Sequence, residues 1–251
     1  MRYFKMSTFL VIFSIFILTG FPIFSQVMVV KTPPLTIDGN LSDWPVDAQF
    51  FDMSYGVAPL SWGAPLDWNI NSKLYLAWDD TYFYFAYTTT DTHLWLDDDP
   101  TEGADDSVEV YFDRNHAPGV QAWTTEFYLF KLNLANSWGG GRGTAPVSTP
   151  AYTFDAAWRP ANNLAANTYV GTLNNNGDTD TSYIIEARVS WSDLNGAPSV
   201  GKKEGLGTAT PDDDDGGGND AGTYNYNLFD LTTFPEIQYA QDLDVNDWLL
   251  Y

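Results

Sequence analysis

Cysteine is absent from this chain of 251 residues, and histidine occurs only twice. Without cysteine, an exported domain cannot be held together by disulfides, and neither a lipid nor a haem can be attached through a thioether. The G-x-S-x-G motif of serine hydrolases is also missing, so no residue pattern supports nucleophilic catalysis. These absences favour a protein without enzymatic activity.

Basic residues are scarce. Lysine and arginine together number 11 against 33 aspartates and glutamates, which gives a formal net charge of −22. Such an acidic surface repels nucleic acids and anionic lipids, so we exclude both as partners. Solubility outside the cell would explain the charge by itself. Because aspartates also gather in loops, at 97–99, 105–106 and 212–215, the sequence further predicts a site for a hard cation such as calcium, which takes oxygen ligands.

No segment has the pattern of a helix three turns long. One long apolar run is present, and it lies close to the N-terminus. Two basic residues precede this run at residues 9–18, and small residues follow it near Gln26. This order is typical of a secretory signal peptide. We therefore expect residues 1–26 to be removed and residues 27–251 to form a single domain. The mature chain should not insert into a membrane, and we expect it to be secreted, at the cell surface or in the periplasm.

The stretch from Leu74 to Asp113 predicts three successive β-strands. Large apolar residues alternate with others along each run, at positions 74, 76 and 78, then 83, 85 and 87, and then 108, 110 and 112. Alternation with a period of two, rich in aromatic and β-branched residues, is the signal of a strand. The connections are short and polar, so neighbouring strands should be antiparallel.

Further strands are predicted at 27–31, 126–134, 152–158, 169–173, 182–189, 224–230 and 245–250. Trp138–Gly143 is expected to be a mobile glycine-rich loop, and the Asn-Gly pair near residue 177 predicts a tight hairpin. Ser190 should open a single helical turn. The fold class that fits is all-β, an antiparallel two-sheet sandwich of the jelly-roll type with minimal helix.

Polar side chains occupy the outward positions of several predicted strands. They are Glu109, Tyr111, Lys131, Asn133, Glu186 and Arg188. If their strands are neighbours, these side chains form one polar patch that can hydrogen-bond a ligand, and ten tryptophans are available to cover its apolar face. The alternative is a solvated sheet face that carries cross-strand ion pairs such as Glu109–Lys131.

The order of several short motifs carries a family resemblance. The motifs are Ile37-Asp38-Gly39 with Asp43-Trp44, Trp78-Asp79-Asp80 before an aromatic strand, Asp106-Ser107-Val108-Glu109 and Glu186 to Trp191. From about Leu35 to Trp191 the chain resembles the family 9 carbohydrate-binding modules and the wider DOMON-like group of β-sandwiches. The resemblance implies a non-catalytic module that binds sugars and often holds structural calcium.

The family's sugar-contacting residues fall on Glu109, Lys131 and Asn133, with lysine where the family can have arginine. A lysine loses the bidentate fork that arginine offers to a carboxylate. The tryptophan that stacks on the sugar in the family precedes the Asp-Ser-Val-Glu motif, where this chain has Gly103-Ala104-Asp105. Trp95 is the nearest candidate upstream, and Trp62, Trp68 and Trp138 are further candidates.

Candidate calcium ligands are the acidic residues of the predicted loops. The strongest are Asp91, Asp97, Asp98, Asp212 and Asp214, and none of them has the spacing of an EF-hand.

Our hypothesis from the sequence is a secreted, calcium-stabilised module that binds a polysaccharide or glycan through Trp95, Glu109, Tyr111, Lys131, Asn133 and Arg188. One alternative is a structural or adhesive cell-surface protein that keeps the fold, has lost sugar binding and assembles with itself or a surface partner. A second is a haem-binding DOMON-like protein, which would need an axial methionine and histidine. Carboxylates are plentiful, but no pair stands out as the acid and base of a glycosidase.

Overall fold

The computed structural model describes residues 27–45, 50–52, 70–97, 105–115, 123–146, 148, 153–175, 177–214, 221–224 and 236–241. The predicted leader, residues 1–26, lies outside this part of the chain. The described elements are, in order, β1 (Val27–Lys31), η1 (Leu41–Asp43), β2 (Phe50–Asp52), β3 (Asn71–Trp78), β4 (Tyr82–Thr90), β5 (Ser107–Asp113), β6 (Phe127–Asn133), β7 (Trp138–Gly143), β8 (Phe154–Asp155), β9 (Asn163–Val170), β10 (Ser182–Ser190), η2 (Trp191–Leu194), β11 (Lys203–Asp212), β12 (Ala221–Tyr224) and β13 (Glu236–Ala240). Neither of the two 3-10 turns has the length or apolar character needed to cross a membrane.

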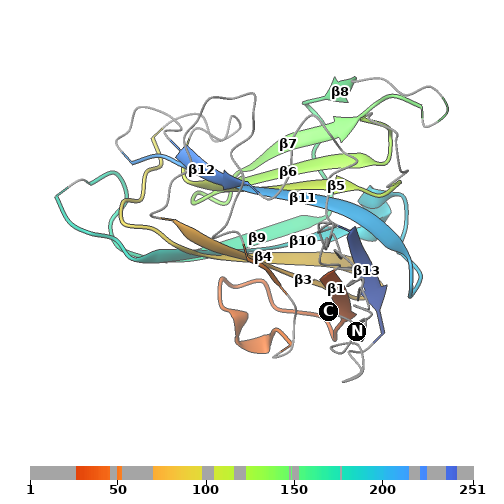
Figure 1. Cartoon of the computed structure of the whole chain (residues 1–251), viewed down its shortest axis with the longest axis horizontal. Coiled ribbons are helices and arrows are strands. Elements are labelled where there is room, and N and C mark those ends of the chain that lie inside the picture. Colours follow the sequence, from red (N-terminus) through yellow and green to blue (C-terminus); the bar gives the residue numbers. More distant parts are fainter. Residues whose placement is uncertain are drawn as a thin grey trace, which may run out of the picture.

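The described strands form one continuous sheet that folds over into two layers (Figure 1). The first layer contains β3, β4, β10 and β9, with β2 paired to β3. The second contains β11, β5, β6, β7 and β8, with β12 paired to β11. Strands β1 and β13 join the layers, and β1 runs parallel to both β3 and β13. The predicted all-β sandwich is therefore confirmed, although β1 departs from a wholly antiparallel arrangement.

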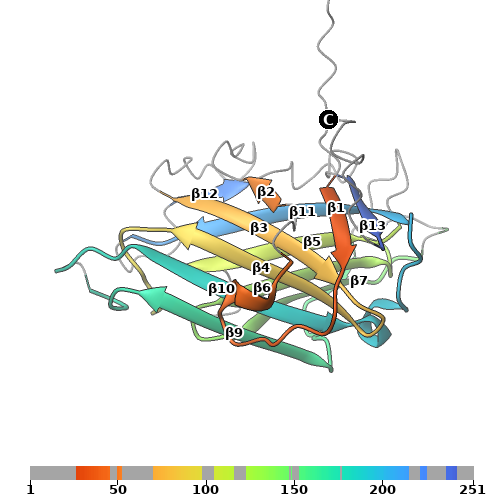
Figure 2. The same ribbon diagram turned by 90° about the horizontal axis from the view of Figure 1, so that it is seen from below.

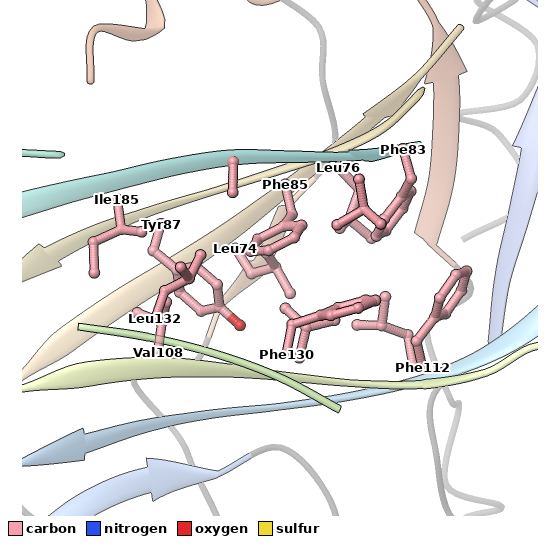
Figure 3. Packing of buried hydrophobic residues seen from close by; sticks show 14 of the residues in the cluster. Leu74, Leu76, Phe83, Phe85, Tyr87, Val108, Phe112, Phe130, Leu132 and Ile185 are labelled. Atoms are coloured by element: carbon pink, nitrogen blue, oxygen red, sulfur yellow. The ribbon is translucent and has the colours of Figure 1, made fainter. Parts of the chain in front are cut away.

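The predicted alternation builds the core between the two layers. Figure 3 shows side chains from β3, β4 and β10 pointing toward side chains from β5 and β6. The aromatic rings meet face to face across the layers: Phe83 stacks on Phe112 with centroids 4.9 Å apart, and Phe85 stacks on Phe130 at 6.0 Å. Large, fully buried aromatic rings of this kind dominate the energy of a core. The three strands read from the sequence are thus placed as expected.

The segment Trp138–Gly143 is strand β7, so its prediction as a mobile loop was wrong. Glycines here permit close packing. Gly140 has a φ of 96°, and a Cβ on it would lie 2.1 Å from the carbonyl oxygen of Leu129 on the neighbouring strand. Trp138 packs its ring against Phe85 and Phe130, so it belongs to the core and not to a surface clamp.

Replacing Gly140 with alanine should lower the free energy of unfolding by roughly 1–3 kcal/mol, because the new methyl group meets backbone at a φ that disfavours a side chain. Chemical denaturation monitored by tryptophan fluorescence measures this change. Gly196→Ala is the matched control, since Gly196 also has a positive φ, 105°, but open space around its Cβ position. Equal losses in the two variants would contradict the steric explanation.

Strand β11 was not predicted at all. Its sequence KEGLGTATPD contains two glycines and a proline and lacks a clear alternation of apolar residues, so it gives little strand signal. Hydrogen bonding to neighbouring strands outweighs this weak propensity, because β11 pairs with β5 on one side and with β13 on the other.

Other boundaries shift. The strand expected at 152–158 is reduced to β8, and the strand expected at 169–173 is β9, which begins at Asn163. The late strand expected at 224–230 is represented by β12 up to Tyr224; residues 225–230, like 245–250, lie outside the described residues. The predicted helical turn is confirmed as η2, where the Ser190 side chain accepts a hydrogen bond from the Ser192 N–H.

Candidate functional site

Glu186 on β10 anchors the segment that follows β1. Its carboxylate accepts hydrogen bonds from the backbone N–H groups of Asp38 and Gly39, each at 2.9 Å, and from the Trp44 indole at 2.7 Å. Burial raises the pKa of Glu186, while these donors act to lower it. These three hydrogen bonds hold residues 35–45 over the outer face of the first layer (Figure 2). Glu186 is therefore a structural residue.

Arg188 lies on the same outer face as Glu186. Its guanidinium carbon is 4.4 Å from the ring centroid of Tyr82 on β4, which is the geometry of a cation–π contact. Because Glu109 and Lys131 lie on the second layer, the fold separates Arg188 from them by the whole core. The single polar patch expected from the sequence is thus divided between two opposite faces.

Glu109 and Lys131 form an ion pair on the second layer. They are direct register partners on β5 and β6, and the Lys131 Nζ lies 2.6 Å from the Glu109 Oε1. The Tyr111 hydroxyl donates a hydrogen bond to the other carboxylate oxygen. Only 6% of the Glu109 side chain and 13% of the Lys131 side chain are exposed. Such a desolvated pair is worth more than an ordinary surface pair and keeps the carboxylate in one orientation.

Asn133 ends strand β6 and builds the turn that follows. Its side-chain oxygen accepts the N–H groups of Ala135 and Ser137, at 3.0 and 3.3 Å, and its amide nitrogen donates to Asp105. The residue is buried, with 1% exposed. Its predicted role as a sugar contact has no support in this geometry, because all of these hydrogen bonds serve the turn and the adjacent loop.

Trp95 lies in the loop that precedes β5 and is close in space to the first residues of that strand. Its backbone N–H donates to the Asp106 carboxylate at 2.7 Å, and its carbonyl accepts from the Asp106 N–H. The side chain is half-buried. Trp95 is therefore held at the same end of β5 as the motif that contains Glu109, as the sequence suggested. Trp62 and Trp68 lie outside the described residues.

An aromatic surface lies beside Tyr111, and no sequence pattern predicted it. Half-buried Trp123 stacks on Phe127, with centroids 5.6 Å apart, and meets Phe154 edge to face at 5.3 Å. Together with Leu129 these residues pack around Tyr111 on the outer side of the second layer. Trp123 precedes β6 in a segment without strand periodicity, so only the tertiary structure brings it into the aromatic cluster that contains Tyr111.

Three buried carboxylates converge at one end of the sandwich. Asp91 follows β4, Asp106 precedes β5 and Asp212 ends β11, and one oxygen of each lies within 4.8 Å of the others. None is more than 3% exposed. We call these three residues the carboxylate cluster. Asp91 and Asp212 were predicted as metal ligands, whereas Asp106 was noted among the loop aspartates and in the Asp-Ser-Val-Glu motif but was not named as a ligand.

The carboxylate cluster places three acidic side chains close together and away from water. Burial raises the pKa of Asp106 well above its usual range, and the neighbouring Asp91 carboxylate raises it further. Burial also raises the pKa of the Tyr183 hydroxyl, and the nearby Asp106 and Asp91 carboxylates raise it further. Charges this deeply buried are usually paired or bound to a metal. A set of three carboxylates offers only oxygen ligands. Such a set fits calcium, which binds oxygen at about 2.3–2.6 Å.

The remaining predicted metal ligands are not members of the carboxylate cluster. Asp214 pairs with the His93 ring, whose Nδ1 is 3.2 Å from the Asp214 Oδ1. Asp97 is exposed, and its backbone N–H donates to Asp105. Asp98 lies outside the described residues. The structure therefore assembles a set of ligands that only partly overlaps the set predicted from the sequence.

Comparison with known proteins agrees with this architecture. A family model described as carbohydrate family 9 binding domain-like matches residues 37–233. A comparison with curated protein sequences finds no match.

Solved structures share the fold. A family 9 carbohydrate-binding module from Caldicellulosiruptor kristjanssonii in complex with cellotriose aligns over 88% of this chain and 96% of its own, with 19% identity and a TM-score of 0.61. The same kind of module in complex with glucose gives 19% identity, 88% and 98% coverage and a TM-score of 0.62. A protein from Bacteroides uniformis aligns over 85% of this chain and 98% of its own, with 11% identity and a TM-score of 0.57.

Proposed function

The chain belongs to the carbohydrate family 9 binding domain-like family, and on this basis we propose that it is a secreted, non-catalytic module that binds a neutral polysaccharide or glycan. The observation that carries the proposal is the Glu109–Lys131 pair on the second layer, at the positions where the family resemblance places sugar contacts. The related module from Caldicellulosiruptor kristjanssonii was solved with cellotriose and with glucose, so these are the first sugars to test.

The Glu109 carboxylate has spare hydrogen-bonding capacity for sugar hydroxyls. The Lys131 ammonium donates to one of its oxygens and holds the carboxylate in place. Glu109 accepts one bond on each oxygen, from Lys131 and Tyr111, and each oxygen can accept a second. A sugar would approach from the side of Lys131, the more exposed partner. Trp123 or Trp95 would then cover the apolar face of the ring.

We also propose that the carboxylate cluster binds calcium. Asp91, Asp106 and Asp212 would supply carboxylate ligands, and the ion would supply the positive charge that three buried carboxylates require. Because the cluster joins the end of β4, the start of β5 and the end of β11, the metal would fix the strand that presents Glu109 three residues after Asp106. Its role is structural.

Glu109→Gln is expected to weaken cellotriose binding by about tenfold or more, since a hydrogen bond to a charged group is worth roughly 1.5–3 kcal/mol. Isothermal titration calorimetry in calcium-containing buffer measures the loss. Glutamine keeps the shape of the side chain, and circular dichroism checks that the variant is folded.

Asp80→Ala serves as the matched control, because Asp80 is an exposed carboxylate paired with Lys31 on the other layer. It should bind like the wild type. Wild-type affinity in Glu109→Gln would remove the pair from the binding site. Failure of the wild type to bind any glycan on an array would favour instead a structural or adhesive protein that has kept only the fold.

A further inference from the structure

The outer face of the first layer is covered over only part of its area. Leu35, Ile37 and Trp44 pack on Ala77, Tyr84 and Ala86. Tyr75 on β3 packs against the edge of this cover. On the other side of Tyr75 the sheet surface is hollowed into a pocket of about 330 Å³. This volume lies within the range of pockets that bind small ligands.

The strand register explains why the pocket is a groove. Two cross-strand rows line it, Asn71–Thr90–Ser182 and Lys73–Thr88–Ile184, each taken from β3, β4 and β10 in turn. The threonines of the central strand are short, while lysine and isoleucine stand on either side of Thr88. The next residue along the floor is Ala86, beside Tyr75. The result is a trough that follows β4 and ends at an aromatic ring, which we call the threonine groove.

The floor of the threonine groove is rigid. On the core side of the same strands, the buried hydroxyls of Ser72 and Thr89 are hydrogen-bonded at 2.9 Å. Strand β4 is paired along its whole length with β3 on one side and with β10 on the other. A site built on paired strands holds its geometry more precisely than one built on loops.

The lining has the chemistry of a sugar site. Hydroxyls from Thr88, Thr90 and Ser182 and the amide of Asn71 can both donate and accept, which matches sugar hydroxyls. Tyr75 offers an aromatic ring and Ile184 an aliphatic surface for the apolar faces of the ring. Among the described residues that line the groove, none is a carboxylate or a histidine, so this lining offers no carboxylate pair for glycoside hydrolysis and no common metal ligand.

The groove is also poorly suited to anions. Within the part of the chain that the structure describes, Lys73 is the one cationic residue of the lining, and Asp52 stands directly opposite it in the β2–β3 pair. The whole chain carries a net charge of −22, which repels phosphates and acidic polymers. A neutral ligand with many hydroxyls satisfies the groove better than an anionic one.

We propose that the threonine groove is a second saccharide site, on the face of the sandwich opposite Glu109 and Lys131. This inference rests on the proposed function only for the class of ligand. The residues of the groove, and the layer on which they lie, differ from those of the Glu109–Lys131 site. A module with sites on two opposite faces can hold two glycan chains at once. Its binding to a polymer would then gain from multivalency, which a single site cannot supply.

Methyl-labelled protein tests this inference residue by residue. The Ile184 methyl reports on the threonine groove, and the Leu129 methyl reports on the Glu109 face. Cellotriose, xylotriose, mannotriose and laminaritriose are each titrated into the mature chain, and the two signals are followed by heteronuclear NMR. With at least one of these sugars, the Ile184 signal should shift and saturate in the wild type and equally in Glu109→Gln.

Thr88→Arg fills the groove and should weaken the binding seen at Ile184 by about tenfold or more while leaving the Leu129 response unchanged. An Ile184 signal that stays still with all four sugars overturns the groove. If Leu129 still responds in that case, the proposed function stands without the second site. If Ile184 responds and Leu129 does not, the groove stands and the Glu109 face fails.

Discussion

Replacing Arg114 with methionine is expected to lower the free energy of unfolding by about 3 kcal/mol, because it breaks a buried charge pair. The Arg114 Nε donates to the Glu204 carboxylate at 3.0 Å, and its side chain is 3% exposed while that of Glu204 is fully buried. The guanidinium also donates to the Gly196 carbonyl at 2.8 Å and lies 5.3 Å from the Trp191 ring centroid.

The size of the loss follows from what remains around Glu204. The Tyr239 hydroxyl still donates to it at 2.7 Å, and the Lys202 ammonium still contacts it from the surface. This residual pairing keeps the cost near the lower end of the roughly 3–5 kcal/mol seen when one partner of a buried pair is removed. In a domain of this size the melting temperature should fall by roughly 6–12 °C.

Lys203→Met is the matched control for Arg114→Met. Lys203 pairs with Glu236 at 2.6 Å, but its side chain is 48% exposed, so its removal should cost less than about 1 kcal/mol. Differential scanning calorimetry of both variants measures the contrast. Similar losses in the two variants would mean that burial does not set the strength of the Arg114–Glu204 pair.

Removal of calcium should produce the second large effect. If the carboxylate cluster binds the ion, calcium at about a hundred times its dissociation constant stabilises the fold by about 2.7 kcal/mol. Addition of calcium to chelated protein should then raise the melting temperature by roughly 5–10 °C. A melting temperature that does not respond to calcium would eliminate the metal site.

Variants of Asp212 and Asp214 distinguish calcium binding at the carboxylate cluster from calcium binding by general surface charge. Asp212→Asn should abolish the calcium response, because Asp212 contributes an oxygen to the cluster. Asp214→Asn should keep it, since Asp214 pairs with His93 instead. Asp106→Asn should also gain little from calcium, because it removes one of the three carboxylates of the cluster. The reverse pattern at residues 212 and 214 would place any bound metal elsewhere.

The strands of the core could be read from the sequence because their signal is local. Within each strand, apolar residues occupy every second position, as Leu74 does on β3, Phe85 on β4 and Val110 on β5. Burial of one face of a strand requires that pattern. Strand β11 shows the limit of this reasoning. Its two glycines and a proline hide it in the sequence, and it becomes a strand because β5 and β13 pair with it on either side.

The candidate site was predictable only where it depends on one hairpin. Glu109 and Lys131 face each other because β5 and β6 are antiparallel neighbours, and the sequence analysis had considered this ion pair as an alternative. The carboxylate cluster needs Asp212 to lie beside Asp106, and that depends on the hidden strand β11. Arg188 has the correct outward parity but lies on the other layer, since parity along a strand does not tell which layer the strand joins.

The pairing of β1 has a consequence for how the chain reaches its native state. β1 is held by β3 on one side and by β13 on the other, so the first described strand is completed by the last. Val27 and Ile237 are register partners although they lie at opposite ends of the chain. Contacts so distant in sequence fold slowly, because a long loop must close before they form. A chain still being synthesised therefore cannot close its sheet until residue 240 has emerged.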